Sequence, residues 1–130
     1  MYTINVKTTK NTEMIDITER IRELILRSDI KTGSCIIFVP HTTAGITINE
    51  NADPSVTADI LAYINKAIPV KNNYLHMEGN SAAHIKASLF GPSQQIIVEN
   101  GAPVLGTWQG IYLCEFDGPR HRRVYVKIFS

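Results

Sequence analysis

The chain has 130 residues, a length that suits one domain with its own hydrophobic core. With 44% hydrophobic and 19% charged residues it has the composition of a globular protein, and no apolar run is long enough to span a membrane. A formal net charge of +1 provides no general attraction to nucleic acid. We therefore expect a single domain over residues 1–130, with neither nucleic acid nor membrane among its partners.

The N-terminal stretch alternates between apolar and polar side chains, which is typical of a half-buried strand. It lacks the apolar core of a signal peptide, so a cytoplasmic location is the expectation. The two cysteines, Cys35 and Cys114, lie in apolar runs without CxxC spacing. We expect them to be buried thiols rather than redox or metal-binding groups.

Eight stretches of alternating or continuous apolar residues predict strands. Their ranges are 2–9, 13–17, 34–39, 45–50, 94–98, 102–105, 107–117 and 121–129. The last two flank the turn sequence DGPR and are predicted to form a terminal β-hairpin. Residues 107–117 carry apolar side chains on both faces, which is typical of a central strand.

Three helices are predicted, at 18–28, 54–68 and 81–90, with Thr18, Asp53 and Asn80 as their N-caps. Their apolar faces are expected to comprise Ile21, Leu24 and Ile25 in the first helix, Ile60, Ile64, Ala67 and Ile68 in the second, and Ala82, Ile85 and Leu89 in the third. Strands outnumber helices, and the helices cluster towards the middle of the chain. This pattern predicts an α+β fold with a mainly antiparallel sheet.

The sequence HTTAGITINENADP places polar side chains at the ends of two successive strands, where functional loops usually begin. These side chains are His41, Thr42 and Thr43 after the first strand and Asn49, Glu50 and Asn51 at the end of the second. Glu50 is a candidate for an acid–base or metal role, because it continues the apolar face of its strand. Thr43, Asn49 and Asn51 could instead stabilise turns. Ala44-Gly45 leaves room for a backbone N–H group to reach an anion.

The segment HMEGNSAAH carries a second set of polar groups around the start of the third helix. Helical side chains lean towards the helix N-terminus, so His84 would point back towards His76 and Glu78. Two converging imidazoles suit a zinc-like divalent metal. The alternative is that His84 hydrogen-bonds a loop while His76 is exposed. Gly79 would let the backbone pass close to a ligand.

Basic residues crowd the end of GTWQGIYLCEFDGPRHRR, after a strand in which Gln109 and Glu115 need polar partners. The arginines are Arg120, Arg122 and Arg123. They could pair with the carboxylates of the preceding strand, or they could clamp a phosphate, whose oxygens match the fork of a guanidinium. The sequence does not decide between the two roles.

Three separated stretches together resemble the YjbQ family, also called UPF0047 or the secondary thiamine-phosphate synthase family. They are PHTTAGITINENADPSV, HMEGNSAAHIKASLFGPS and LGTWQGIYLCEFDGPRHRRVYV, and the resemblance covers essentially the whole chain. It implies a compact YjbQ-like α+β domain that assembles as a homotrimer. It also implies a weak thiamine-phosphate synthase activity, in which a pyrimidine pyrophosphate is joined to a thiazole phosphate and pyrophosphate is released.

The resemblance also implies roles for individual residues, together with a divalent metal ion, either zinc or magnesium. Carried over by position, the catalytic residues are Glu50, His41 and Arg123, and the metal ligands are His41, His76 and His84. The substrate-binding residues are Thr42, Thr43, Asn49, Asn51, Gly79, Asn80, Trp108, Gln109 and Glu115. In a trimer these residues could meet across a subunit boundary.

Two other functions remain open at this stage. One is a trimeric module that binds a metal or a phosphorylated metabolite without catalysis, and the other is a metal-dependent hydrolase. The chain has no Gly-rich phosphate loop and no paired acidic motif for magnesium pyrophosphate, which argues for weak or different catalysis. No Ser or Cys nucleophile with an evident base is present, which argues against covalent hydrolysis. The native substrate, the metal and the roles of Arg120, His121 and Arg122 are not specified by the sequence.

Overall fold

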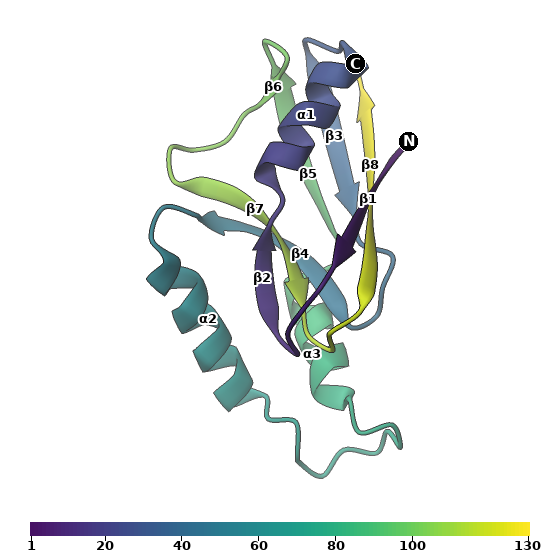
Figure 1. Ribbon diagram of the computed structural model, residues 1–130, viewed down its shortest axis with the longest axis vertical. Helices are drawn as coiled ribbons and strands as arrows, with labels where there is room; N and C mark the ends of the chain where they lie inside the picture. The colour runs from purple at the N-terminus through teal and green to yellow at the C-terminus, as the bar shows by residue number, and fades with distance from the viewer.

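The computed structural model describes all 130 residues as two antiparallel sheets and three helices (Figure 1). The helices are α1 (Thr18–Ser28), α2 (Pro54–Ala67) and α3 (Ser81–Phe90). The strands are β1 (Tyr2–Lys7), β2 (Glu13–Asp16), β3 (Gly33–Phe38), β4 (Ala44–Glu50), β5 (Ser93–Glu99), β6 (Ala102–Pro103), β7 (Gln109–Glu115) and β8 (His121–Phe129). The predicted α+β fold with mainly antiparallel pairing is confirmed.

The strands form one sheet in the order β1-β8-β3-β5-β6 and a second in the order β2-β7-β4. The prediction of a terminal hairpin is wrong, because β7 pairs with β2 and β4 whereas β8 pairs with β1 and β3. No hairpin ladder holds the connection between β7 and β8. It is held instead by backbone hydrogen bonds to other segments, from Phe116 N to Thr43 O and from Thr8 N to Arg120 O. The prediction that β7 is a central strand is confirmed.

The main core lies between α1 and the inner faces of both sheets (Figure 1). Ile21 and Ile25 of α1 are fully buried there, packed with strand residues such as Ile37 and Val124. The opposite face of the five-stranded sheet has no helix on it and leaves four large apolar side chains partly exposed. These are Ile36, Phe38, Ile97 and Phe129. None of the three helices combines the length and the apolar character that crossing a bilayer requires.

Of the three predicted N-caps, Asp53 and Asn80 occupy the cap position and Thr18 does not. Asp53 caps α2 as predicted, its Oδ1 accepting from Ser55 N at 2.9 Å. Thr18 is the first helical residue of α1 rather than its cap, and its N–H and hydroxyl donate to Asp16. Asn80 occupies the N-cap position of α3, but its side chain makes no capping bond. The amide of Asn80 has another partner, described below.

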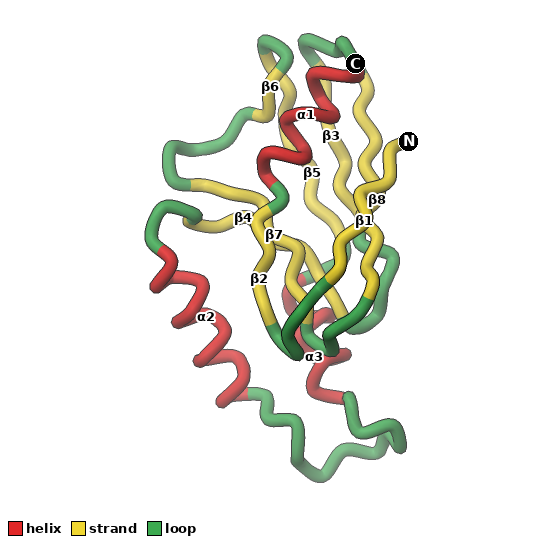
Figure 2. Tube along the Cα trace, viewed as in Figure 1, coloured by secondary structure: helices red, strands yellow, loops and turns green.

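The predicted apolar faces of α2 and α3 are met only in part: Ala82 is buried, and Ile60, Ile64 and Ile68 are half-buried. No residue of α2 is buried, and Figure 2 shows it followed by a long loop that extends beyond the sheets. In α3 the large residues Ile85 and Leu89 remain 38% and 66% exposed, whereas the buried positions are small residues and Lys86. Small side chains let α3 approach β4 closely: a Cβ added at Gly45 would lie 3.0 Å from Gly91 O. The close approach of α3 to β4 therefore determines which face of α3 is buried.

The two cysteines are buried free thiols, as expected. Burial raises the pKa of Cys35 to about 11 and that of Cys114 to about 12. Cys114 packs with Tyr112 and Phe116 in a small second core beneath α3. Neither thiol is available as a thiolate near neutral pH.

Candidate functional site

A polar cavity of about 420 Å³ lies where the two sheets meet the start of α3. It has no hydrophobic lining residue, and we call it the histidine pocket. Its lining residues are Pro40, His41, Thr42, Thr43, His76, Glu78, Asn80, His84, Asp117, Arg120 and Arg122. They come from the loop after β3, the segment leading into α3, and the connection between β7 and β8. The structure thus brings together parts of all three sequence motifs.

The predicted convergence of His76 and His84 is present in the structure. Their ring centroids are 5.3 Å apart and the rings meet edge to face at 89°. His76 lies in the exposed loop before α3, whereas His84 is half-buried one turn into the helix. Because helical side chains lean towards the N-terminus, His84 reaches back over the loop.

His41 joins the pocket from the end of the β3 segment, and its Nε2 accepts a hydrogen bond from Arg123 N at 2.9 Å. An imidazole that accepts at Nε2 while neutral carries its proton on Nδ1. Burial, together with the charges of Arg122 and Arg123, lowers the pKa of His41 below its ordinary value. We infer that His41 is neutral at pH 7 and that, as placed, it offers no free lone pair to a metal.

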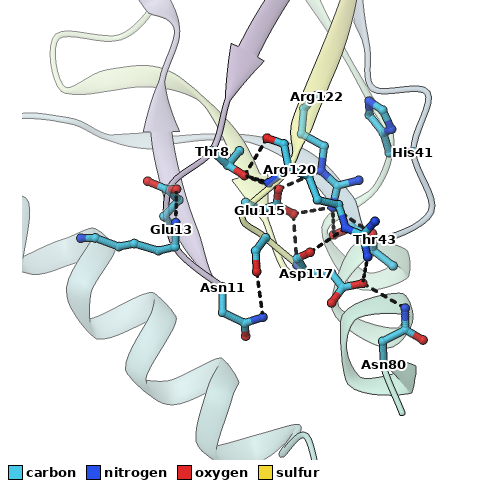
Figure 3. A network of polar contacts seen from close by, with 12 residues as sticks. Thr8, Asn11, Glu13, His41, Thr43, Asn80, Glu115, Asp117, Arg120 and Arg122 are labelled. Atoms are coloured by element: carbon cyan, nitrogen blue, oxygen red, sulfur yellow. Dashed lines mark hydrogen bonds and ion pairs between the residues drawn. The ribbon is translucent and has the colours of Figure 1, made fainter. Parts of the chain in front are cut away.

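Beneath the pocket lies a buried ion pair between Glu115 and Arg122 (Figure 3). Arg122 Nε donates to Glu115 Oε1 at 2.8 Å, and its Nη2 donates to Glu115 Oε2 and to the carbonyl and hydroxyl oxygens of Thr43. The Thr8 hydroxyl and the Asp117 N–H complete the shell of the carboxylate. Burial by itself raises the pKa of Glu115, but these hydrogen bonds outweigh it and hold the pKa below its ordinary value.

A second polar chain, also drawn in Figure 3, borders the pocket. Arg120 donates to the carbonyl and the carboxylate of Asp117, and Asn80 Nδ2 donates to the same carboxylate at 2.9 Å. Because Asp117 can only accept, the amide of Asn80 must turn its nitrogen towards it. This leaves Asn80 Oδ1 as the one fully buried side-chain nitrogen or oxygen atom without a hydrogen-bond partner.

The remaining predicted site residues lie at the other end of the β4–β7 ladder. They are Asn49, Glu50, Asn51, Trp108 and Gln109. Six residue steps along β4 separate this group from Ala44 beside the pocket, which corresponds to about 20 Å in an extended strand. Its own contacts are local: Asn51 Nδ2 donates to Asp16 Oδ2, and Gly106 N donates to Gln109 Oε1. Within one chain the predicted site is therefore divided into two groups.

Glu50 illustrates this separation. Its backbone carbonyl accepts from the Tyr112 hydroxyl at 3.1 Å, and its side chain is half-buried without a hydrogen bond. The sequence grouped Glu50 with His41 around one site, but within a single chain the two residues lie at opposite ends of β4. Trp108 is 62% exposed just before β7, so it too lies at a surface. Both residues are free to contact another molecule.

Three other sequence expectations have definite outcomes. Gly45 packs closely against α3, where an added Cβ would lie 3.0 Å from Gly91 O, and Ala44 is buried at the start of β4. Gly79 adopts a φ of +79° with open space on its Cβ side, so it supplies a left-handed turn at the pocket rim. Arg123 points its guanidinium over the Tyr125 ring, 5.9 Å from the centroid, on the outer face of the sheet. Its side chain does not line the pocket.

The donor set fits a divalent metal only partly. His76 and His84 could both hold an ion, and Asn80 Oδ1 is an oxygen without a partner. However, no group of three His, Cys, Asp or Glu side chains is arranged to hold a metal ion. Catalytic zinc sites usually have three protein ligands. One chain therefore supplies an incomplete metal site.

A family model described as UPF0047 protein YjbQ-like matches residues 2–130. The chain belongs to this family. A UPF0047 protein of Methanocaldococcus jannaschii is 56% identical over 130 residues, covering 100% of this chain and 94% of that protein. The UPF0047 protein YugU of Bacillus subtilis is 54% identical over 131 residues, covering 100% of this chain and 99% of YugU.

Solved structures of YjbQ-like proteins share this fold. An uncharacterized conserved protein of the family from Clostridium acetobutylicum matches with a TM-score of 0.98 at 56% identity, over 99% of this chain and 100% of that one. A YbjQ-like protein of unknown function from Sulfolobus solfataricus matches with a TM-score of 0.94 at 37% identity, over 98% and 94%. The predicted YjbQ-like fold is confirmed.

The pocket of this YjbQ-like chain includes Arg120 and Arg122, for which the sequence left phosphate binding and carboxylate pairing open. It also includes Asp117, and Thr8, just after β1, supports it through Glu115; the sequence indicated no site role for either residue. One signal was available for Arg122. Strand alternation in β8 places it on the same face as Val124, which is fully buried, and places Arg123 on the opposite face.

Proposed function

We propose that the histidine pocket binds the phosphate groups of small molecules and that the chain is a weak secondary thiamine-phosphate synthase. In this reaction a pyrimidine pyrophosphate is joined to a thiazole phosphate, and pyrophosphate leaves. The single observation that carries the proposal is the lining of the pocket, which holds three histidines and two arginines against two carboxylates and has no hydrophobic residue. Such a lining suits a phosphorylated ligand far better than an apolar one.

The leaving pyrophosphate requires stabilisation of negative charge, and this is the task that the pocket can perform. Arg122 and the Nδ1–H group of His41 are hydrogen-bond donors held by the fold. His76 and His84 would suit a zinc ion, whereas a magnesium ion would need oxygen ligands such as the carboxylate of Glu78. When bound, such an ion would neutralise phosphate oxygens as a Lewis acid. Thr42 remains available to orient the substrate, and Asn80 holds the Asp117 carboxylate beside it.

Glu50, Asn49, Asn51, Trp108 and Gln109 can act on the same substrate only if a second copy supplies them. We therefore include the homotrimer in the proposal. The division of the polar residues between two ends of one ladder supports it, and so does the uncovered apolar face of the five-stranded sheet. In such an assembly the carboxylate of Glu50 could face the cationic pocket of its neighbour.

The proposal is tested by incubating purified, untagged protein with the pyrimidine pyrophosphate and the thiazole phosphate and measuring thiamine phosphate by chromatography. We expect slow formation of product and at least a tenfold loss in His76→Ala and His84→Ala. Thr3→Ala, on the exposed outer face of β1, serves as the control. Unchanged turnover in both histidine variants would contradict the proposed site.

Metal binding is measured separately, by elemental analysis of the same four proteins after dialysis against zinc. We expect bound metal in the wild type and the Thr3→Ala control and its loss in the two histidine variants. If the wild type binds no metal, His76 and His84 act as acid–base or anion-binding groups instead, and the metal part of the proposal is wrong.

A non-catalytic module that binds phosphorylated metabolites is the second candidate. The incomplete metal donor set of one chain favours it. Tight binding of both substrates without product would support this function. Release of inorganic phosphate without thiamine phosphate would instead indicate the metal-dependent hydrolase.

A further inference from the structure

The guanidinium of Arg122 is fixed on two sides by the protein. Its Nε and Nη2 together reach Glu115 and Thr43, with distances of 2.8 Å to Glu115 Oε1 and 2.9 Å to Thr43 Oγ1. These contacts hold the planar group in one orientation. Arg122 is only 5% exposed, so it has almost no contact with bulk solvent.

The third nitrogen of the group, Nη1, makes no hydrogen bond within the chain, although its two N–H groups are strong donors. It is also absent from the fully buried side-chain atoms without a partner, of which Asn80 Oδ1 is the only one. Nη1 therefore keeps accessible surface. Since Arg122 lines the histidine pocket, that surface opens towards the pocket.

The two neighbouring arginines are engaged differently. Arg120 is about half exposed, with a side-chain exposure of 52%, and its donors face Asp117. Arg123 stacks over Tyr125 on the outer face of the sheet. Arg122 alone combines near-complete burial, a fixed orientation and a free donor nitrogen beside the pocket.

We propose that Arg122, through Nη1, is the residue that binds a phosphate oxygen of the ligand, and that Glu115 is a positioning residue that acts through it. A donor held in place loses little conformational freedom when the ligand arrives, so its hydrogen bond contributes more to affinity than that of a mobile surface arginine. The proposal rests on the proposed phosphate-binding function of the pocket. In this proposal Arg122, rather than Arg123, is the arginine that binds the anion.

The experiment uses isothermal titration of the full chain with inorganic phosphate and with pyrophosphate. Arg122→Lys keeps a positive charge against Glu115 but removes Nη1. Because this variant could unfold, the pair Arg122→Met with Glu115→Gln removes both buried charges together, and circular dichroism checks the fold of each protein. Arg123→Gln tests the rival arginine, and Lys127→Gln on the exposed face of β8 is the charge-matched control.

We expect both Arg122 variants to bind pyrophosphate roughly 10- to 100-fold more weakly, as for the loss of a hydrogen bond to a charged group. Arg123→Gln and Lys127→Gln should stay within about twofold of the wild type. Folded Arg122 variants that bind as tightly as the wild type would overturn this inference while leaving the proposed pocket intact, and so would an equal loss in Arg123→Gln. Absence of binding by the wild type would overturn the pocket and the inference together.

Discussion

Glu115 is the residue on which the site and the fold depend together. Its carboxylate is fully buried and tolerable only because Arg122, Thr8 and the Asp117 N–H satisfy its oxygens. Removing one partner of such a pair leaves an uncompensated buried charge. Alternation along β7 correctly indicated from the sequence that Glu115 faces inwards and needs a partner. Arg122, seven residues away, was one of three arginines that the sequence offered as its partner, and only the fold selects it among them.

We predict that Glu115→Ala lowers the free energy of unfolding by about 3–5 kcal/mol, because it leaves the Arg122 guanidinium buried without its counter-ion. Glu13→Ala is the control, since Glu13 lies in β2 and its contacts are exposed hydrogen bonds to the backbone of Thr9 and Lys10. Urea unfolding followed by circular dichroism measures both variants. A loss below about 1 kcal/mol in Glu115→Ala would contradict the importance of the pair.

The same pair predicts a pH dependence of stability. The pKa of Glu115 is lowered from 4.5 on folding, so its stabilisation is fully present above pH 4.5 and is lost as the pH falls through the lower folded value. The wild type should therefore lose stability more steeply below pH 4.5 than the Glu115→Gln/Arg122→Met variant. Urea unfolding at pH 7, 5, 4 and 3 measures this difference. Parallel curves of stability against pH for the two proteins would show that folding does not change the pKa of Glu115.

Among the elements, the helices show how far apolar spacing can be trusted. The stripe of α1 was predicted correctly because large apolar side chains pack there against the main core. The stripe of α3 was not, because close approach to β4 selects alanines and leaves Leu89 outside. Apolar spacing identifies a helix face. It does not say whether that face packs through large buried side chains, as in α1, or through small side chains that let the backbones approach closely, as in α3.

A further prediction concerns the attachment of α2 to the rest of the molecule. This helix has no buried residue, and Asn65 links it to the body by accepting from the buried Lys86 Nζ at 2.7 Å and donating to Thr12 Oγ1 at 3.0 Å. Burial lowers the pKa of Lys86, and Asn65 is its only hydrogen-bond partner. Asn65→Ala leaves this ammonium group unsatisfied, at a cost of about 1–3 kcal/mol.

We therefore expect backbone amides of α2 to exchange with deuterium roughly tenfold faster in Asn65→Ala, with those of α1 unaffected. Asp59→Ala, an exposed change on the same helix, is the matched control. Hydrogen exchange followed by mass spectrometry resolves the two helices. Equal exchange of α2 in both variants would mean that Asn65 does not hold the helix in place.

For the whole molecule, the sequence indicated which segments carry the chemistry but not how they are distributed in space. The fold class, the central position of β7 and the convergence of His76 and His84 follow from local periodicity, which a sequence contains. The division of the strands into two sheets depends on pairing between distant segments. That pairing separates Glu50 from His41, although both lie in one short stretch of sequence.

Because Glu50 and His41 are separated within one chain, the oligomeric state of the protein decides whether they can belong to one site. If a neighbouring copy completes the site, the protein in solution has three times the 14.5 kDa mass of the chain, as light scattering on a gel-filtration column would measure. The uncovered face of the five-stranded sheet gives a variant that tests this, because Ile97 is 61% exposed in the single chain. Ile97→Lys should place a charge in the interface and shift the protein towards the monomer, since an unpaired charge is costly to bury.

Leu26→Lys, which adds the same charge at a side chain that is 65% exposed on α1 and away from this sheet face, is the control for surface charge alone. A wild-type mass equal to that of one chain would remove Glu50 and Trp108 from the catalytic proposal and leave the histidine pocket as a site of one subunit. A trimer that persists in Ile97→Lys would instead place the interface elsewhere, for example at the exposed end of the β4–β7 ladder. The polar group at that end would then be the next surface to probe for contact with the neighbouring pocket.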